Sequence, residues 1–328
     1  MAVPDLNAYT PGWLFRSPHI NTIYPHLFRK HIKIAYDRRR LQTSDGDFID
    51  LDNRINGSQT AVLMLHGLEG SSSSHYIKGM TRAVEKMNYD VFVMNQRGCS
   101  GELNKKYGSY HSGKTDDLNE VIQFITEEYD YKNLILVGFS LGGNICLKYT
   151  GEKGQELDRR IKAVVAISVP CDLSESAQYL ARSSNFLYMK RFMRMLKSKA
   201  LKKAVRHPES KLKEAEIKKC ADFASFDEIY TAPAHGFDSA EHYWKVNSSK
   251  QFIHRIKRNT LLINALDDPF FGNLSHPVNE CTNNPMMTFE QPKHGGHVGF
   301  AQWNLSKNLW HENRTITFIE QSISQSYG

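Results

Sequence analysis

The stretch Leu134-Ile-Leu-Val-Gly-Phe-Ser-Leu-Gly-Gly-Asn144 carries the strongest structural signal in this chain. Four apolar residues typical of a buried strand run directly into G-x-S-x-G, from Gly138 to Gly142, and a segment of helical composition follows. A strand that turns so sharply into a helix needs glycines around the turn, because Cβ atoms there would clash. The stretch therefore predicts a strand, a tight turn and a helix, with Ser140 exposed above a sheet as a candidate nucleophile.

Similar apolar runs recur along the chain, separated by helix-length segments. Their β-branched content and continuous apolarity are typical of parallel strands covered on both faces. This alternation predicts a doubly wound α/β sheet. The expected strands are residues 61–65, 91–94, 134–137, 163–169, 261–265 and 286–289, and residues 32–39 and 48–51 are expected to form an antiparallel hairpin at the sheet edge.

The alternation stops at residues 172–258, which read as a helical insertion within a single domain of residues 1–328. Apolar residues recur there at helical spacing between Met189 and Ala200, and Lys190 to Lys203 contains seven positive charges. Two interpretations stay open: a solvated helix that packs its apolar stripe on the domain, or a lid that contacts acyl chains or a membrane surface.

Composition narrows the class of protein. The 328 residues are 40% apolar and 23% charged, which is typical of a soluble globular protein. A net charge of +7 without a basic motif does not predict a nucleic-acid partner. Five scattered cysteines without a C-x-x-C pair predict neither disulfides nor a metal site. No apolar window is long enough to span a membrane, so a cytoplasmic location is expected.

A serine hydroxyl needs a histidine base to take its proton, and the histidine needs a carboxylate to orient it. In this fold class the carboxylate follows the serine in the sequence, and the histidine follows the carboxylate. Asp267 and Asp268 follow the strand 261–265, and a parallel sheet places its functional groups at this end of its strands. Both are candidates for the acid, and Asp268 is favoured because a loop begins directly after it. His294 and His297 lie in a glycine-rich loop further on, and His297 is favoured as the base.

An oxyanion is expected to meet two backbone N–H groups. One is that of Leu141 at the start of the helix after the serine, and the other is that of Leu68 in the turn after the first parallel strand. His66 in the same turn is expected to be a buried residue that bonds to backbone. The alternative for the whole motif is a glycine-rich turn whose serine caps a helix.

These segments resemble the α/β-hydrolase superfamily and, within it, the YheT/EMB8-type (AB hydrolase 4-like) family. The resemblance spans nearly the whole chain in family order. It is carried by His66-Gly-Leu-Glu-Gly70, Asn95-Gln-Arg-Gly-Cys-Ser-Gly101, Tyr110-His-Ser-Gly113, Gly138-Phe-Ser-Leu-Gly-Gly-Asn144, Asn264-Ala-Leu-Asp-Asp-Pro-Phe270 and Gly295-Gly-His-Val-Gly-Phe300. It implies Ser140 as nucleophile, Asp268 as acid and His297 as base.

The expected function is a serine hydrolase that cleaves carboxylic esters, including medium-chain, long-chain or lipid esters, through an acyl-enzyme and without a cofactor. The alternative is a hydrolase-fold binding or scaffold protein that does not turn over. Expected partners are a small-molecule or lipid ester and, weakly, an anionic membrane surface. The sequence leaves the oligomeric state open.

Overall fold

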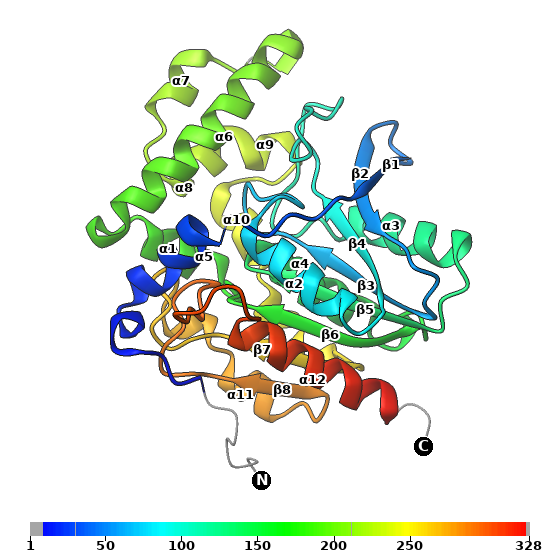
Figure 1. Cartoon of the computed structure of the whole chain (residues 1–328). Helices are drawn as coiled ribbons and strands as arrows, with labels where there is room; N and C mark the ends of the chain where they lie inside the picture. The colour runs from blue at the N-terminus through cyan, green and yellow to red at the C-terminus, as the bar shows by residue number, and fades with distance from the viewer. Residues whose placement is uncertain (1–8, 30, 211, 326–328) are drawn as a thin grey trace.

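An eight-stranded sheet forms the centre of the protein in the computed structural model, which describes residues 9–29, 31–210 and 212–325 (Figure 1). The strand order is β1-β2-β4-β3-β5-β6-β7-β8, and every pair from β4 to β8 is parallel. The predicted α/β-hydrolase fold, with its mostly parallel sheet, is confirmed. The strands are β1 (Asp37–Gln42), β2 (Phe48–Arg54), β3 (Thr60–Leu65), β4 (Asp90–Asn95), β5 (Asn133–Phe139), β6 (Ile161–Ile167), β7 (Asn259–Ile263) and β8 (Met287–Glu290).

The antiparallel hairpin lies at the sheet edge as predicted, but its first strand, Asp37–Gln42, lies further along the chain than the predicted residues 32–39. β1 begins at Asp37, so residues 32–36 lie outside it. The register explains the difference: Asp37 faces Asn53, and β2 ends one residue later at Arg54. Residues before Asp37 therefore have almost no strand left to pair with.

Helices cover both faces of the sheet because the central strands β3 to β6 are buried on both sides. α2 and α12 pack on one face, where alternate strand residues such as Val62 and Met64 meet them. α3 and α4 cover the other face against residues such as Leu63 and Leu65. The helices outside the segment between β6 and β7 are η1 (Trp13–Arg16), α1 (Pro18–Phe28), α2 (His75–Glu85), α3 (Thr115–Glu128), α4 (Leu141–Lys153), η2 (Gly154–Glu156), η7 (Asn273–Ser275), α11 (Val278–Thr282) and α12 (Trp310–Ser324).

The segment between β6 and β7 is helical and has an apolar cluster of its own. In Figure 1 its green and yellow helices stand beside the sheet at the upper left. Among the described residues, no helix combines the length and apolarity needed to cross a membrane. The elements are α5 (Leu173–Leu180), η3 (Ser183–Asn185), α6 (Phe186–Arg206), η4 (Pro208–Ser210), α7 (Glu214–Lys219), α8 (Phe223–Phe226), the π-helical η5 (Asp227–Thr231), α9 (Ala232–Ala234), α10 (Ala240–Asn247) and η6 (Ser249–Arg255).

One of the two interpretations of the segment 172–258 predicts that the basic face of α6 is solvated. The structure agrees only in part, because two of its lysines contact other parts of the protein. Lys203 is fully buried, and its ammonium donates to the carbonyl oxygens of Asn104, at 2.8 Å, and Lys106. Burial lowers the pKa of Lys203 to about 8. Lys199 donates to Glu69 at 2.8 Å. The reason is that α6 packs against the loops beyond β3 and β4, so these two cations replace water with carbonyl and carboxylate oxygens.

His311 on α12 makes the stability of the fold sensitive to acid. Its ring lies against those of Phe139 and Phe300, and neither ring nitrogen has a hydrogen-bond partner in the described part of the chain. Burial, with the nearby charge of Arg29, lowers the pKa of His311 to about 3. Between about pH 3 and 6.5 the unfolded chain therefore binds more protons than the folded one, and stability is lost as the pH falls.

We expect His311→Phe to reduce this acid sensitivity. Wild-type protein should lose about 2 kcal/mol more than the variant in the free energy of unfolding between pH 6.5 and pH 5, since one proton is worth about 1.4 kcal/mol per pH unit. Urea unfolding at the two pH values measures the difference. His254→Phe, at an exposed position, is the control and should behave like wild type. Equal acid losses in wild type and His311→Phe would contradict the prediction.

Candidate active site

The turn after β5 holds Ser140 in a strained conformation. Its φ of 52° and ψ of −122° lie where residues other than glycine are uncommon, so the surrounding structure must impose them. The flanking glycines permit the turn. A Cβ at Gly138 would lie 2.5 Å from the carbonyl oxygen of Gly142, and a Cβ at Gly142 would lie 2.4 Å from that of Leu65. Ser140 is thereby presented at the carboxyl edge of the sheet.

Ser140, His297 and Asp268 come together in the structure from three separate segments. His297 Nε2 lies 2.9 Å from Ser140 Oγ, and His297 Nδ1 lies 2.9 Å from Asp268 Oδ2. The carboxylate accepts from Nδ1–H, which leaves Nε2 free to accept from the serine hydroxyl. Burial raises the pKa of Asp268, and the nearby His297 opposes that rise. The Phe270 ring stacks on the imidazole with 4.0 Å between centroids and restricts its rotation.

The two competing residues form a second pair beside the first. His294 Nδ1 lies 3.1 Å from Asp267 Oδ2, and the Gly296 N–H donates to Asp267 Oδ1 at 2.9 Å. Asp267 therefore supports the loop that carries His297, while Asp268 contacts the His297 ring itself. The adjacent aspartates point to different histidines because the turn after β7 directs successive side chains apart.

An N-terminal segment braces the same loop, which the sequence did not reveal. Thr22 on α1 accepts from the His297 N–H at 2.8 Å, and Asn21 accepts from the Ala301 N–H at 2.8 Å. A Cβ at Gly296, whose φ is +56°, would lie 2.6 Å from the carbonyl oxygen of Pro18. The sequence carries no local pattern that links Thr22 to a loop so far along the chain.

The loop after β3 lies directly against Ser140. A Cβ at Gly67 would be 3.0 Å from the Cβ of Ser140. Among residues 9–29, 31–210 and 212–325, no acceptor is hydrogen-bonded to the backbone N–H of Leu68 or of Leu141. Both amides therefore keep their hydrogen-bonding capacity for a ligand, as an oxyanion hole requires.

Three side chains that the sequence did not single out for this role hold this loop in place. Tyr76 accepts from the Gly67 N–H at 3.0 Å, and Tyr110 accepts from the Glu69 N–H at 2.7 Å. Lys199 of α6 and the Tyr110 hydroxyl both donate to the Glu69 carboxylate, at 2.8 and 2.9 Å. Glu69 has a φ of +54°, so these contacts fix a residue in the left-handed region directly after Leu68.

His66 has the structural role that was expected. It is fully buried, and its Nε2 accepts from the Gln96 N–H at 3.1 Å. Its Nδ1–H therefore donates to the carbonyl oxygen of Gly67 at 2.8 Å. Burial lowers the pKa of His66 to about 4, so the ring stays neutral near pH 7. The residue shapes the loop and does not contact Ser140.

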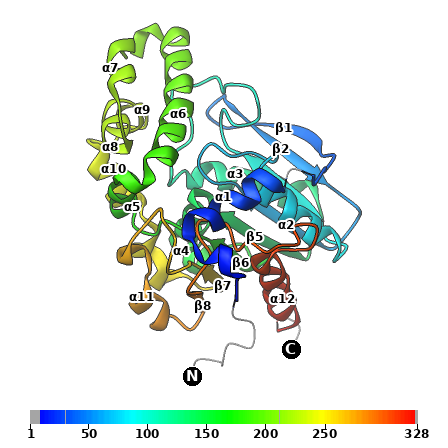
Figure 2. The same cartoon turned by 60° about the vertical axis from the view of Figure 1, so that its left-hand side comes forward.

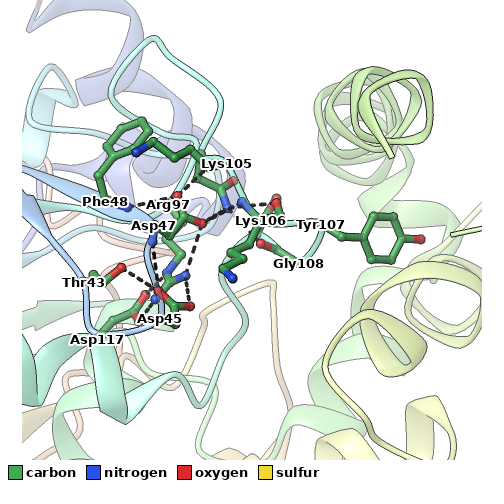
Figure 3. Close-up of polar contacts among 12 residues, drawn as sticks. Thr43, Asp45, Asp47, Phe48, Arg97, Lys105, Lys106, Tyr107, Gly108 and Asp117 are labelled. Carbon is green, nitrogen blue, oxygen red and sulfur yellow. Dashed lines mark hydrogen bonds and ion pairs between the residues drawn. The ribbon is translucent and has the colours of Figure 1, made fainter. Parts of the chain in front are cut away.

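Arg97, just after β4, is a buried residue that holds three acidic side chains together. Figure 3 shows its guanidinium between the carboxylates of Asp45, Asp47 and Asp117, which it meets at 2.7, 3.2 and 2.7 Å. Asp47 also accepts from the backbone N–H groups of residues 105 and 106. With Lys203 bonded to carbonyls of the same loop, this network positions the loop against α6.

A cavity of about 440 Å³ opens beside Ser140 and His297. Part of its wall is apolar and comes mainly from the helices between β6 and β7, with Leu173, Leu180, Phe192, Leu196, Phe223 and Phe226. The described residues contain no group of three or more His, Cys, Asp or Glu side chains arranged to hold a metal ion. The chemistry available here is that of a serine, a histidine and a carboxylate next to an apolar cavity.

Known proteins are similar to this chain in sequence. A family model described as the alpha/beta hydrolase fold matches residues 60–302. The chain is 33% identical over 306 residues to the proposed esterase YheT of Escherichia coli (strain K12), covering 92% of this chain and 89% of that protein. It is 25% identical over 326 residues to the phospholipase ABHD3 of Mus musculus, covering 97% and 77%. Over 280 residues it is 27% identical to a monoacylglycerol lipase of Saccharomyces cerevisiae, covering 82% and 61%.

A solved structure agrees with these sequence comparisons. The esterase Pf2001 of Pyrococcus furiosus superposes with a TM-score of 0.61 at 18% identity, covering 90% of this chain and 93% of that one. At this identity the likeness supports the fold alone, while the match to the family model and to YheT extends to the sequence. The chain therefore belongs to the α/β-hydrolase family.

Proposed function

We propose that this protein, a carboxylic ester hydrolase, cleaves medium- and long-chain acyl esters through an acyl-enzyme on Ser140. One observation carries the proposal: the 2.9 Å contact between Ser140 Oγ and His297 Nε2 lies beside an apolar cavity. The esterase, lipase and phospholipase names of the relatives support ester bonds as the target.

In the first half of the reaction, Ser140 Oγ attacks the ester carbonyl carbon while His297 Nε2 takes the hydroxyl proton. Asp268 stabilises the imidazolium and keeps its orientation. The negative oxygen of the tetrahedral intermediate accepts from the Leu68 and Leu141 amides. The carbon–oxygen bond to the alcohol then breaks, and His297 gives the proton to the departing alcohol.

In the second half, water attacks the acyl-enzyme. His297 removes one proton from the water, the same two amides hold the oxyanion, and the bond to Ser140 Oγ breaks as the proton returns to that oxygen. The products are the carboxylic acid and the free enzyme, so no further reactant is needed.

The apolar wall of the cavity supports a medium or long acyl chain as the preferred acyl group of the ester. The helices that supply it belong to the cluster between β6 and β7, so we assign residues 172–258 the role of a lid. Phe186 and Leu187 at the start of α6 are 60% and 73% exposed, beside several lysines and arginines. We therefore also propose a weak peripheral contact of this end of the lid with anionic lipid surfaces.

We expect kcat/KM for p-nitrophenyl octanoate to exceed that for the acetate by at least about tenfold, because each buried methylene adds about 0.8 kcal/mol. Ala177→Phe places a ring in the cavity wall and should lower octanoate turnover about tenfold while sparing acetate. Ala181→Phe is the matched control, because Ala181 is exposed and lies just after α5, the helix that carries Ala177. Acetate as the best substrate would overturn the chain-length proposal, and no hydrolysis of any ester would overturn the reaction.

A further inference from the structure

One arm of the cavity is basic, in contrast to the apolar wall on the helices between β6 and β7. Its lining side chains come from three elements: His26 from α1, His75 and Lys78 from the start of α2, and Arg191 from α6. α1 packs against α2. In Figure 2, α1 lies on the side of α6 that faces α2, while α8 and α10 lie on its other side. The cavity therefore has an apolar part and a cationic part.

The cationic part lies about one helical turn from residues that contact His297 or the ring stacked on it. Thr22 accepts from the His297 N–H, and His26 follows it by four residues on the same face of α1. The ring of Tyr188 lies 4.9 Å from that of Phe270, which stacks on His297, and Arg191 follows Tyr188 by three residues on α6. A turn of helix rises about 5.4 Å, which is the span of a few covalent bonds.

The charges of Arg191 and Lys78 have few partners among the described residues. Arg29 lines the same region, but it is paired with Glu312, and both side chains are fully buried. Neither Arg191 nor Lys78 forms an ion pair with a carboxylate in the described part of the chain. The guanidinium of Arg191 instead lies 3.2 Å from Nε2 of His26. The positive charges of Arg191 and Lys78 therefore lie here without a matching acid in the described part of the chain.

His75 adds an unused polar atom to this arm. Its Nε2 is buried and lacks a hydrogen-bond partner within the described residues. Burial, followed by the charges of His26 and Arg29, lowers the pKa of His75 to about 3. Buried polar atoms normally have partners, so an orphan atom in a cationic cavity wall is suited to a ligand that brings acceptor oxygens.

We propose that this arm binds an anionic group, a phosphate or carboxylate, carried by the alcohol part of the ester. The inference rests on the proposed function, because it places the acyl chain along the apolar wall and the ester carbonyl at Ser140. The alcohol then extends toward α1 and α2, and an anion a few bonds from the ester oxygen reaches Arg191, Lys78 and His26. The preferred substrates are acyl esters of phosphorylated or carboxylated alcohols.

Kinetics tests the charge preference with two esters that differ only in the anion: 1-decanoylglycerol and 1-decanoylglycerol 3-phosphate, both as monomers in solution. Wild type should have the higher kcat/KM for the phosphate. Arg191→Gln and Lys78→Gln, which lie on different elements, should each lower that value about fivefold, the effect expected of one partly exposed charge. The value for the neutral ester should fall by less, about twofold at most, because that ester carries no anion for these side chains to contact.

Arg194→Gln is the matched control, since it removes one charge from the exposed face of α6 outside the cavity lining. It should alter neither ester, which separates a local contact from a change in net charge. A wild-type preference for the neutral ester, or equal losses for both esters in Arg191→Gln and Lys78→Gln, would overturn the proposal.

A binding experiment keeps the inference testable even if the protein hydrolyses no ester at all, an outcome that would overturn the proposed function. Calorimetry on Ser140→Ala should show decyl phosphate binding at least about fivefold more tightly than 1-O-decylglycerol, and the added Arg191→Gln change should remove that difference. Inorganic phosphate alone should bind more weakly than decyl phosphate, because it lacks the acyl-like chain. Equal binding of the two decyl ligands would overturn the anionic site itself.

Discussion

Ser140→Ala and His297→Ala should each lower kcat for p-nitrophenyl octanoate by about three to six orders of magnitude. The reason is that the serine is a weak nucleophile until the imidazole, 2.9 Å away, takes its proton. The double variant should lose no more than either single variant, because the two groups act in one step. Initial rates with each purified protein measure the effect.

Active-site labelling gives an independent measurement of the same step. A fluorophosphonate probe should label wild type at Ser140 and should leave Ser140→Ala unlabelled. Thermal melting should stay close to wild type for both single variants, which excludes loss of the fold as the cause. Losses that add in the double variant, or a label that persists without Ser140, would contradict a shared mechanism.

Asp268→Asn should lower kcat by about three to four orders of magnitude, while Asp267→Asn should cost about tenfold or less. The amide that Asp268→Asn introduces can donate its N–H to Nδ1 of His297. The imidazole then carries its proton on Nε2, so it cannot accept the proton of the serine. In another serine hydrolase the same change lowers kcat by about 10⁴. Asp267 contacts His294 and the Gly296 N–H, so its loss loosens a loop only.

The two aspartates serve as controls for each other, because they are adjacent and lose the same charge. Rates with one ester at saturating concentration are sufficient for the comparison. A larger loss for Asp267→Asn would transfer the acid role to that residue and leave the proposed reaction class unchanged.

The sequence predicted those features whose signals are local. The strand, turn and helix around Ser140 lie within eleven residues, and the apolar run, the glycine spacing and the helical composition together identify them. The sheet and its order of helices follow from apolar runs that each extend over four to seven residues. The choice between Asp267 and Asp268 could only be weighted, because both follow the same strand and the direction of each side chain depends on the turn.

Long-range contacts explain what the sequence did not predict. Thr22 and His297 are 275 residues apart, and a single hydroxyl on an N-terminal helix has no pattern that points to a distant loop. In the sequence, Lys199 is one of several positive charges on a basic helix. In the structure it contacts Glu69, which lies 130 residues earlier in the chain. Such roles arise from tertiary packing and leave no periodic trace in the chain.

The brace between Thr22 and His297 has a consequence for how the protein is made. During synthesis, α1 emerges before Ser140, and the loop that α1 supports follows only after both. A nascent chain that ends before residue 297 therefore contains the serine without its histidine, and α1 lacks its docking surface. Completion of the site waits for contacts of very high sequence separation, which are typically slow to form.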